Sequence, residues 1–318
     1  MYQYDVVALG ELLIDFTLNG VSGQRNGMYE ANPGGAPCNV LAMLQKLGKT
    51  TAFIGKVGND FFGTLLLDTV NGLGIDISNL VMDEDVPTTL AFVYTKEDGD
   101  RSFSFYRNPG ADMMLRFDEV KEELLRQTKI FHFGSLSMTE KEIEYTTKMS
   151  VEKAKQFGAL ISFDPNLRPS LWNRLGRAKE MIEYGLSKTD ILKISDDEIE
   201  FMTGKKDIDE GVRRLQDQYH IPFLCATMGK NGSKVFYKDY KVECEAFHRK
   251  NTVDTTGAGD TFCACMLNAI IETGMEHMGE KELFEMLRFA NAAASLITTK
   301  KGALNVMPEE DMVWDSIK

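Results

Sequence analysis

The chain has few cysteines, few prolines and no excess of basic residues. Its 318 residues include 5 Cys and 8 Pro, and 36 Lys and Arg stand against 48 Asp and Glu, for a net charge of −12. This acidic balance argues against nucleic-acid binding, which normally needs a basic patch. Five cysteines do not make a disulfide framework, and Cys263 and Cys265 lack the second close pair that a structural zinc site needs.

Targeting and membrane signals are also missing. A membrane-spanning helix needs about 18 uninterrupted apolar residues, and the best run, at 263–271, is shorter and contains Asn268. The first residues lack the basic segment and the long apolar segment of a secretion signal. We therefore expect a cytoplasmic protein with reduced thiols and with no membrane or nucleic-acid partner.

Short apolar runs alternate along the chain with longer segments of helical period. One such segment, 37–47, begins with Pro37 and stops at Gly48, as helix ends prefer, and another spans 283–297. The alternation predicts an α/β fold with a mostly parallel sheet covered by helices on both faces. No linker interrupts the pattern, so residues 1–318 are expected to form one domain. The expected strands lie at 6–9, 51–54, 130–133, 160–163, 191–194 and 223–227.

Two segments depart from this pattern. Residues 88–107 contain two alternating stretches around Asp98-Gly99, which is a hairpin signal, and residues 17–30 are polar and rich in glycine. Together they could form a small antiparallel β lid, from about 16–31 and 88–108, over the ends of the strands. An ordinary hairpin at the edge of the sheet explains the same pattern equally well.

The strongest local signal is Asp254-Thr-Thr-Gly-Ala-Gly-Asp260, which precedes an apolar run. A glycine-rich turn that opens a helix directs free N–H groups at one point, where the helix dipole adds positive charge. Such a turn suits a phosphate group. Asp260 would then serve either as a general base or simply as a helix cap. Other nucleotide motifs are missing, because 48–50 lacks the P-loop glycine and no Gly-x-Gly-x-x-Gly follows the first strand.

Polar residues follow several expected strands, at the edge where open α/β sheets bind ligands. Asp15 follows the first strand, and Asp164-Pro-Asn-Leu-Arg168 follows another. A carboxylate at this edge can hold two sugar hydroxyls, although each aspartate could instead be a cap. In Asn32-Pro-Gly-Gly-Ala-Pro-Cys-Asn39, the Asn39 amide could bind hydroxyls, whereas a tight turn and a helix start explain the motif without a ligand.

Three other features have simpler explanations. His132 lies inside an apolar strand, which favours a hydrogen-bonded interior histidine over a catalytic one. No cysteine has a compelling histidine partner in the sequence, so a thiol nucleophile is not expected. The acidic run 196–198 is either a solvated helix start or a place where Glu198 orients magnesium through water.

Taken together, these motifs resemble those of the ribokinase-like carbohydrate kinases, and within them the fructokinases. The N-terminal signature of that family matches 34–39, Gly-Gly-Ala-Pro-Cys-Asn, and continues at 53–60, and its C-terminal signature matches 254–260. The resemblance covers nearly the whole chain, and two such blocks in this order are highly specific. The similarity to fructokinases in particular rests on 105–112 and 164–168.

The resemblance implies a Rossmann-like α/β fold with a small β lid, and ATP-dependent transfer of the γ-phosphate to a primary hydroxyl, here the 6-hydroxyl of D-fructose. Asp260 would be the catalytic base, with no need of a greatly raised pKa. Magnesium would accompany ATP, potassium is held by many relatives, and relatives often form homodimers through their lids. By position, the resemblance places the anion hole at Gly257, Ala258 and Gly259, the sugar contacts at Asp15, Gly34, Gly35, Asn39, Arg107 and Arg168, the nucleotide contacts at Lys193, Ser195, Glu198, Thr227, Gly229, Gly232 and Asn291, and the cation ligands at Asp254 and Thr256.

One position departs from the family pattern. Where the family often has Asn-x-x-Glu, this chain has Ser195-Asp-Asp-Glu198, and the shorter serine weakens the expectation of a water-mediated contact to phosphate or magnesium. Other functions stay open: a kinase for 2-keto-3-deoxygluconate or a ribose derivative, a non-catalytic sugar or nucleotide sensor, and a nicotinamide oxidoreductase. The intact Gly-Ala-Gly-Asp argues against the sensor, and the missing glycine fingerprint argues against the oxidoreductase.

Overall fold

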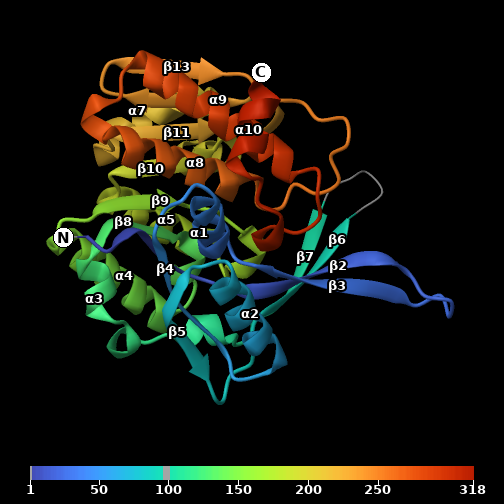
Figure 1. The fold of residues 1–318 in the computed structure, drawn as a ribbon. Helices are drawn as coiled ribbons and strands as arrows, with labels where there is room; N and C mark the ends of the chain where they lie inside the picture. Colours follow the sequence, from blue (N-terminus) through green and yellow to red (C-terminus); the bar gives the residue numbers. More distant parts are fainter. Residues whose placement is uncertain (1, 96–100) are drawn as a thin grey trace.

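A nine-stranded sheet forms the centre of the molecule in this computed structural model, which describes residues 2–95 and 101–318 (Figure 1). Its strands are β1 (Tyr4–Leu9), β4 (Thr51–Gly58), β5 (Asp76–Asp83), β8 (Thr128–Gly134), β9 (Leu160–Asp164), β10 (Ile191–Ser195), β11 (Phe223–Thr227), β12 (Ser233–Tyr237) and β13 (Tyr240–Cys244). They follow the order β13-β12-β11-β10-β9-β8-β1-β4-β5. The strands from β5 to β11 pair in parallel, and β12 and β13 add an antiparallel edge. The mostly parallel sheet is thus confirmed.

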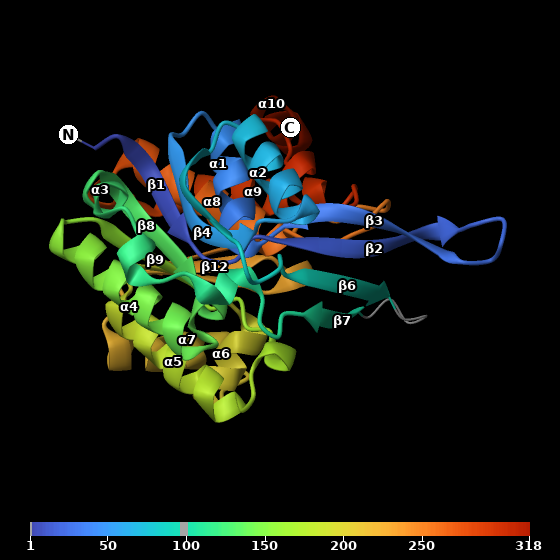
Figure 2. The same ribbon diagram turned by 90° about the horizontal axis from the view of Figure 1, so that it is seen from below.

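Helices cover both faces of this sheet, as expected (Figure 2). One face carries α1 (Ala36–Lys46), α2 (Phe61–Gly72), α8 (Ala258–Thr273), α9 (Glu280–Ile297) and α10 (Glu310–Ile317). The other carries α3 (Glu122–Arg126), α4 (Lys141–Gln156), α5 (Leu175–Lys188), α6 (Asp196–Thr203) and α7 (Ile208–Tyr219). The helix expected at 37–47 is α1, and the one expected at 283–297 is α9, which begins three residues earlier.

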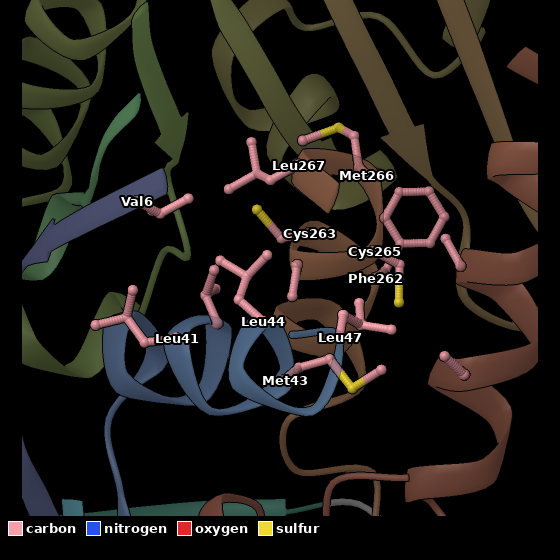
Figure 3. Close-up of a cluster of buried hydrophobic side chains, with 14 of the residues drawn as sticks. Val6, Leu41, Met43, Leu44, Leu47, Phe262, Cys263, Cys265, Met266 and Leu267 are labelled. Atoms are coloured by element: carbon pink, nitrogen blue, oxygen red, sulfur yellow. The ribbon is translucent and has the colours of Figure 1, made fainter. Parts of the chain in front are cut away.

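The cores on the two faces follow from the alternation of side chains along the strands. In β1, Val6 and Ala8 pack with one set of helices, and Val7 and Leu9 pack with the other. On the first face α1 lies directly against α8, with fully buried side chains such as Leu44 between them (Figure 3). This packing fixes the position of the first turns of α1 and α8 relative to each other.

A separate four-stranded sheet projects from the body (Figures 1 and 2). It consists of β2 (Leu13–Val21), β3 (Gly27–Gly34), β6 (Leu90–Thr95) and β7 (Arg101–Tyr106), in the order β3-β2-β6-β7. Because β2 pairs with β6 in parallel, both lid segments expected from the sequence belong to one small sheet, and the strands of 88–107 do not extend the edge of the central sheet. The sheet is mixed rather than antiparallel as expected, since only the β2–β3 and β6–β7 pairs are antiparallel. The turn expected at Asp98-Gly99 lies outside the described residues.

The sequence did not reveal β5, β12 and β13, which lie at the two edges of the central sheet. Polar residues interrupt each of these strands, so their apolar pattern is weak: Ser78 and Asn79 in β5, Lys234 in β12, and Lys241 and Glu243 in β13. The order of the strands also reverses at β1, which has β4 on one side and β8 on the other. Ligands of open α/β sheets bind at such a reversal, outside the carboxyl ends of the strands.

Candidate active site

Two adjoining cavities lie at this edge of the sheet. The first, of about 300 Å³, is lined by the ends of β1 and β10, the first turns of α1 and α8, and the lid strands β2 and β7. The second, of about 560 Å³, lies toward β11 and α9. The two cavities share five lining residues: Asn166, Arg168, Lys193, Thr255 and Gly259. A third, more open groove of about 760 Å³ along β12 and β13 is lined by none of the expected site residues.

The glycine-rich turn opens α8 at the junction of the two cavities. Gly257 is the N-cap and has φ of 77°, a left-handed conformation that glycine adopts without strain. A Cβ at this position would lie 2.9 Å from the Cβ of Ala303. Among the described residues, the N–H groups of Gly257 and Gly259 have no hydrogen-bond partner, and that of Ala258 donates to the Thr255 carbonyl at 3.3 Å. Unpaired N–H groups at a helix start attract anions.

Asp260 lies in the first turn of α8 and lines the first cavity. Its Oδ2 accepts a hydrogen bond of 2.8 Å from Nδ2 of Asn39, on the first turn of α1. Burial raises the pKa of Asp260 to about 6, against the lowering effect of Asn39 and of the nearby Lys193. The sequence had suggested that no great rise was needed, and the rise comes from burial, which a local motif does not reveal.

The first cavity presents further oxygen acceptors. Oδ1 of Asn39 is buried and has no hydrogen-bond partner within the described part of the chain, and the carboxylate of Asp15 lines the same space. Gly35, with φ of 132°, lies so close to the segment after β1 that a Cβ would be 2.3 Å from the main-chain oxygen of Glu11. Gly34 faces Asp15, since a Cβ there would lie 2.6 Å from its Oδ2. Such acceptors suit a ligand that donates several hydroxyl hydrogens.

Glu11 lines this cavity as well, and no sequence motif had marked it as a site residue. Its Oε1 accepts a hydrogen bond of 3.0 Å from the N–H of Ala36, at the start of α1. Burial raises the pKa of Glu11 to about 7. Glu11 comes directly after the first strand, in Gly10-Glu-Leu-Leu-Ile-Asp15. This position was a signal for a site residue, but only Asp15 of this segment was predicted to be one.

The second cavity gathers the residues expected at a nucleotide: Lys193, Ser195, Glu198, Thr227, Gly229, Gly232 and Asn291. Ser195 and Glu198 form a capping box at the start of α6, in which the Ser195 N–H donates to Oε2 of Glu198 at 2.8 Å. Oε1 of Glu198 accepts from the Leu167 N–H, also at 2.8 Å. The acidic run thus begins a helix, and Glu198 is buried within its cap rather than freely solvated.

Asn291 and Gly232 shape the far wall of the second cavity. Nδ2 of Asn291 donates to the carbonyls of Cys244 and Glu245 at 3.1 and 3.2 Å, and its Oδ1 accepts from Ser233. A Cβ on Gly232, which has φ of 90°, would lie 2.1 Å from the Cys244 oxygen. Asn291 therefore holds the end of β13 in place, and Gly232 allows its close approach.

Two expected sugar contacts, Gly34 and Arg107, line neither cavity, and Arg107 is turned toward another partner. Its guanidinium is buried and pairs with Asp112, with 2.7 Å between Nη2 and Oδ2. It also donates to Oγ1 of Thr139 and to the carbonyl of Leu136. Arg107 thus joins the base of the lid to the body. Its direct contact with a sugar stays a prediction without support from this geometry.

Asp254 and Thr256 directly precede the turn at the start of α8. The Asp254 carboxylate accepts hydrogen bonds from the N–H of Thr256 at 2.7 Å and from that of Gly302 at 3.2 Å. It therefore ties the turn to the segment after α9. Only Thr256 of this pair lines the first cavity.

The remaining expectations concern residues outside this pair of cavities. His132 is buried, with Nδ1 2.9 Å from Oγ of Ser162, and burial lowers its pKa to about 3. All five cysteines are free thiols. Within residues 2–95 and 101–318, no group of three His, Cys, Asp or Glu side chains could hold a metal ion. No helix in the same ranges is long and apolar enough to cross a membrane.

Residues 3–310 match the model of the pfkB family of carbohydrate kinases. This chain belongs to that family. It is 42% identical over 307 residues to probable fructokinase-2 of Arabidopsis thaliana, covering 96% of this chain and 93% of that protein.

Solved structures show the same relationship. The fructokinase of Xylella fastidiosa with bound ATP superposes with a TM-score of 0.90 at 29% identity, over 99% of this chain and 98% of the other. A double mutant of the Vibrio cholerae O395 fructokinase, with fructose, ADP and potassium bound, gives 0.89 at 27% identity, over the full length of both chains. The architecture of this carbohydrate kinase, a central sheet with a small separate one, is thus that of its relatives.

Proposed function

We propose that this kinase transfers the γ-phosphoryl group of ATP to the 6-hydroxyl of D-fructose. Its relatives over nearly the full length include fructokinases, and two of the related structures hold ATP or fructose with ADP. The observation that carries the proposal is the position of Asp260. Its carboxylate lines the smaller cavity, and the adjacent Gly259, whose N–H has no partner among the described residues, lines both cavities. A base and an anion site therefore meet where two ligands would touch.

The smaller cavity, called here the sugar cavity, would hold fructose through Asp15, Asn39 and the main chain at Gly35. Asp260 would orient the 6-hydroxyl and take its proton. The N–H groups at 257–259 would stabilise the negative charge of the phosphoryl group as it moves. Those of Gly257 and Gly259 open α8 and have no partner among the described residues, which supports this role. Alignment and charge compensation dominate in phosphoryl transfer, whose transition state is loose and negatively charged.

The larger cavity, called here the nucleotide cavity, would hold ATP with magnesium. Magnesium in such sites is bound largely by phosphate oxygens, with one or two protein carboxylates. The residues present fit this arrangement, because Asp196 and Glu198 line the cavity and no complete metal cage exists in the described residues. When bound, the ion offsets the charge of the phosphates.

A monovalent cation, such as potassium, would be held at Asp254 and Thr256. Carboxylate and carbonyl oxygens are the ligands that hard cations prefer. The Thr298 carbonyl is next to this pair, since it accepts a hydrogen bond of 3.1 Å from the Asp254 N–H. Positive charge there would support the turn at the start of α8. A comparison of turnover in potassium with turnover in tetramethylammonium salts tests this site.

In this proposal residues 1–318 form one domain, and its small sheet acts as a lid that excludes water from the transfer.

The same sheet offers a surface for a homodimer, because apolar side chains on it are about half exposed: Leu18, Val21, Met28, Tyr29 and Tyr106. Light scattering of the wild type and of Val21→Lys tests the dimer. We also place the protein in the cytoplasm.

A panel of phosphoryl acceptors with ATP, magnesium and potassium tests the function. Fructose should be the best acceptor, and mass spectrometry should find the phosphate on its 6-oxygen. Faster turnover of 2-keto-3-deoxygluconate or of a ribose derivative would replace the substrate within the same class. Absence of turnover with every sugar, together with sugar binding, would favour a sensor.

A further inference from the structure

Lys193 is the buried cation at the junction of the two cavities. It lines both of them, and only 6% of the residue is exposed. Arg168 also lines both cavities, but it is only half buried and its Nη1 donates to the Leu167 carbonyl. Lys193 is therefore the buried cation among the residues that the two cavities share.

The ammonium of Lys193 is held in its charged form by carboxylates. Its Nζ lies 3.0 Å from Oδ2 of Asp164, at the end of the neighbouring strand β9. Burial alone would lower the pKa of Lys193, but Asp164 and Glu198 raise it above its ordinary value. Asp164 is its one ion-pair partner among the residues described. An ammonium has three donors, so this pairing leaves capacity for another acceptor.

The ammonium also faces the turn at the start of α8. A Cβ on Gly259 would lie 3.1 Å from Nζ of Lys193, so the missing side chain leaves this approach open. The charge of Lys193 also acts on Asp260, whose pKa it lowers against the effect of burial. The cation, the free N–H groups and the base therefore surround one small space.

We infer that Lys193 is a catalytic residue whose ammonium contacts the phosphoryl group in transfer, with Asp164 as the residue that positions it. The inference rests on the proposed phosphotransfer and deepens it. It assigns Lys193 to the transferred γ-phosphoryl group in particular, rather than to the nucleotide in general.

In this step the bond between the γ-phosphorus and the bridging oxygen breaks, and its electron pair leaves with ADP. A bond forms between the sugar oxygen and the phosphorus, and the hydroxyl proton passes to Asp260. The peripheral oxygens of the phosphoryl group stay negatively charged throughout. A fixed cation in a buried site stabilises them more strongly than it would in water.

The chain contains a matched control for this lysine. Lys56, on β4, is equally buried and pairs with Asp83 at 3.0 Å and with Glu119 at 2.9 Å. It lines neither the sugar cavity nor the nucleotide cavity. Lys56→Met thus measures the effect of losing a buried, paired ammonium alone, and Lys193→Met measures that kind of effect plus any role in transfer.

The experiment compares the two variants in turnover and in nucleotide affinity. Lys193→Met should lose about 100- to 1,000-fold in turnover, on the scale of one lost transition-state donor, and Lys56→Met far less. By calorimetry, Lys193→Met should keep ADP affinity within about threefold and lose roughly ten times more affinity for β,γ-imido-ATP, because one charged contact to the γ-phosphate is gone. Lys193→Arg, which keeps the charge, should recover part of both.

Equal losses for ADP and β,γ-imido-ATP, or turnover equal to that of Lys56→Met, would overturn the inference. If Lys193→Met does not fold, Asp164→Asn replaces it. This variant should also lose more affinity for β,γ-imido-ATP than for ADP, and equal losses would again overturn the inference. The calorimetric comparison needs no sugar. Absence of fructose phosphorylation by the wild type would therefore refute the proposed function while this test of Lys193 still gives its answer.

Discussion

The sugar cavity and the nucleotide cavity share a wall but differ in charge and in hydrogen bonding. The sugar cavity is lined by the carboxylates of Glu11, Asp15 and Asp260, and the Asn39 oxygen in it has no partner among the described residues. The nucleotide cavity is lined by more cations, including Lys230 and Arg249. The difference matches the two ligands, because a sugar donates hydroxyl hydrogens whereas a nucleotide carries negative charge.

The two cavities also differ in how their polar groups are held. On the nucleotide side, Ser195, Glu198 and Asn291 are engaged by caps and main-chain groups. On the sugar side, burial raises the pKa values of Glu11 and Asp260. Buried carboxylates are costly to keep charged, so the sugar side is the part of the site where function works against stability.

The largest expected effect separates chemistry from nucleotide binding. Asp260→Asn removes the base but keeps the shape of the side chain, so turnover should fall about 100-fold or more, on the scale of general-base catalysis. ADP affinity should change little, because Asp260 lines the sugar cavity alone. Steady-state kinetics and calorimetry measure the two quantities. Near-normal turnover would remove Asp260 from the role of base.

A pair of glycine substitutions should affect the two cavities separately. A Cβ on Gly35 would lie 2.3 Å from the Glu11 oxygen, and one on Gly232 would lie 2.1 Å from the Cys244 oxygen, each at a positive φ. Gly35→Ala should therefore raise the KM for fructose about tenfold, and Gly232→Ala should raise the KM for ATP by a similar factor, as strain of about 1–3 kcal/mol per site allows.

Gly176→Ala is the control for this pair, because nothing lies within 4 Å of the added Cβ and its φ is not positive. Both KM values should stay close to those of the wild type in this variant. If Gly35→Ala and Gly232→Ala instead raise the same KM, the two cavities do not divide the ligands as proposed.

Much of the site was readable from the sequence because its parts are local. The turn at 257–259 and the polar residues after β1 and β9 follow from glycine spacing and from strand ends, and the structure brings them together. Long-range contacts were not readable. That Arg107 turns away to Asp112, or that Lys193 faces Gly259, depends on packing between distant segments.

The fold shows the same limit. The six strands expected in the middle of the sheet are mostly apolar, because both their faces are buried, although single polar residues such as His132 and Lys193 interrupt them. The edge strands β5, β12 and β13 have mixed patterns and were missed. One lid built from two segments was expected, but as an antiparallel sheet. The parallel pairing of β2 with β6, which joins the two segments, has no local signal in the sequence.

The smallest expected effect is a shift in pH dependence, which tests the raised pKa on the sugar side. Asp260 must be deprotonated to act as a base, so kcat/KM for fructose should fall as the pH drops below about 6, its pKa in the free enzyme. Asn39 lowers that pKa through its hydrogen bond. In Asn39→Ala the acid limb should therefore move to higher pH.

Two controls identify the titrating group. Asn79→Ala removes a buried asparagine that bonds to Glu119 and Lys121, away from both cavities, and should leave the limb in place. Glu11, with its pKa of about 7, faces the same cavity. If Glu11→Gln, rather than Asn39→Ala, moves the limb, the acid limb belongs to Glu11, and the sugar side depends on a carboxylate that the family motif does not mark.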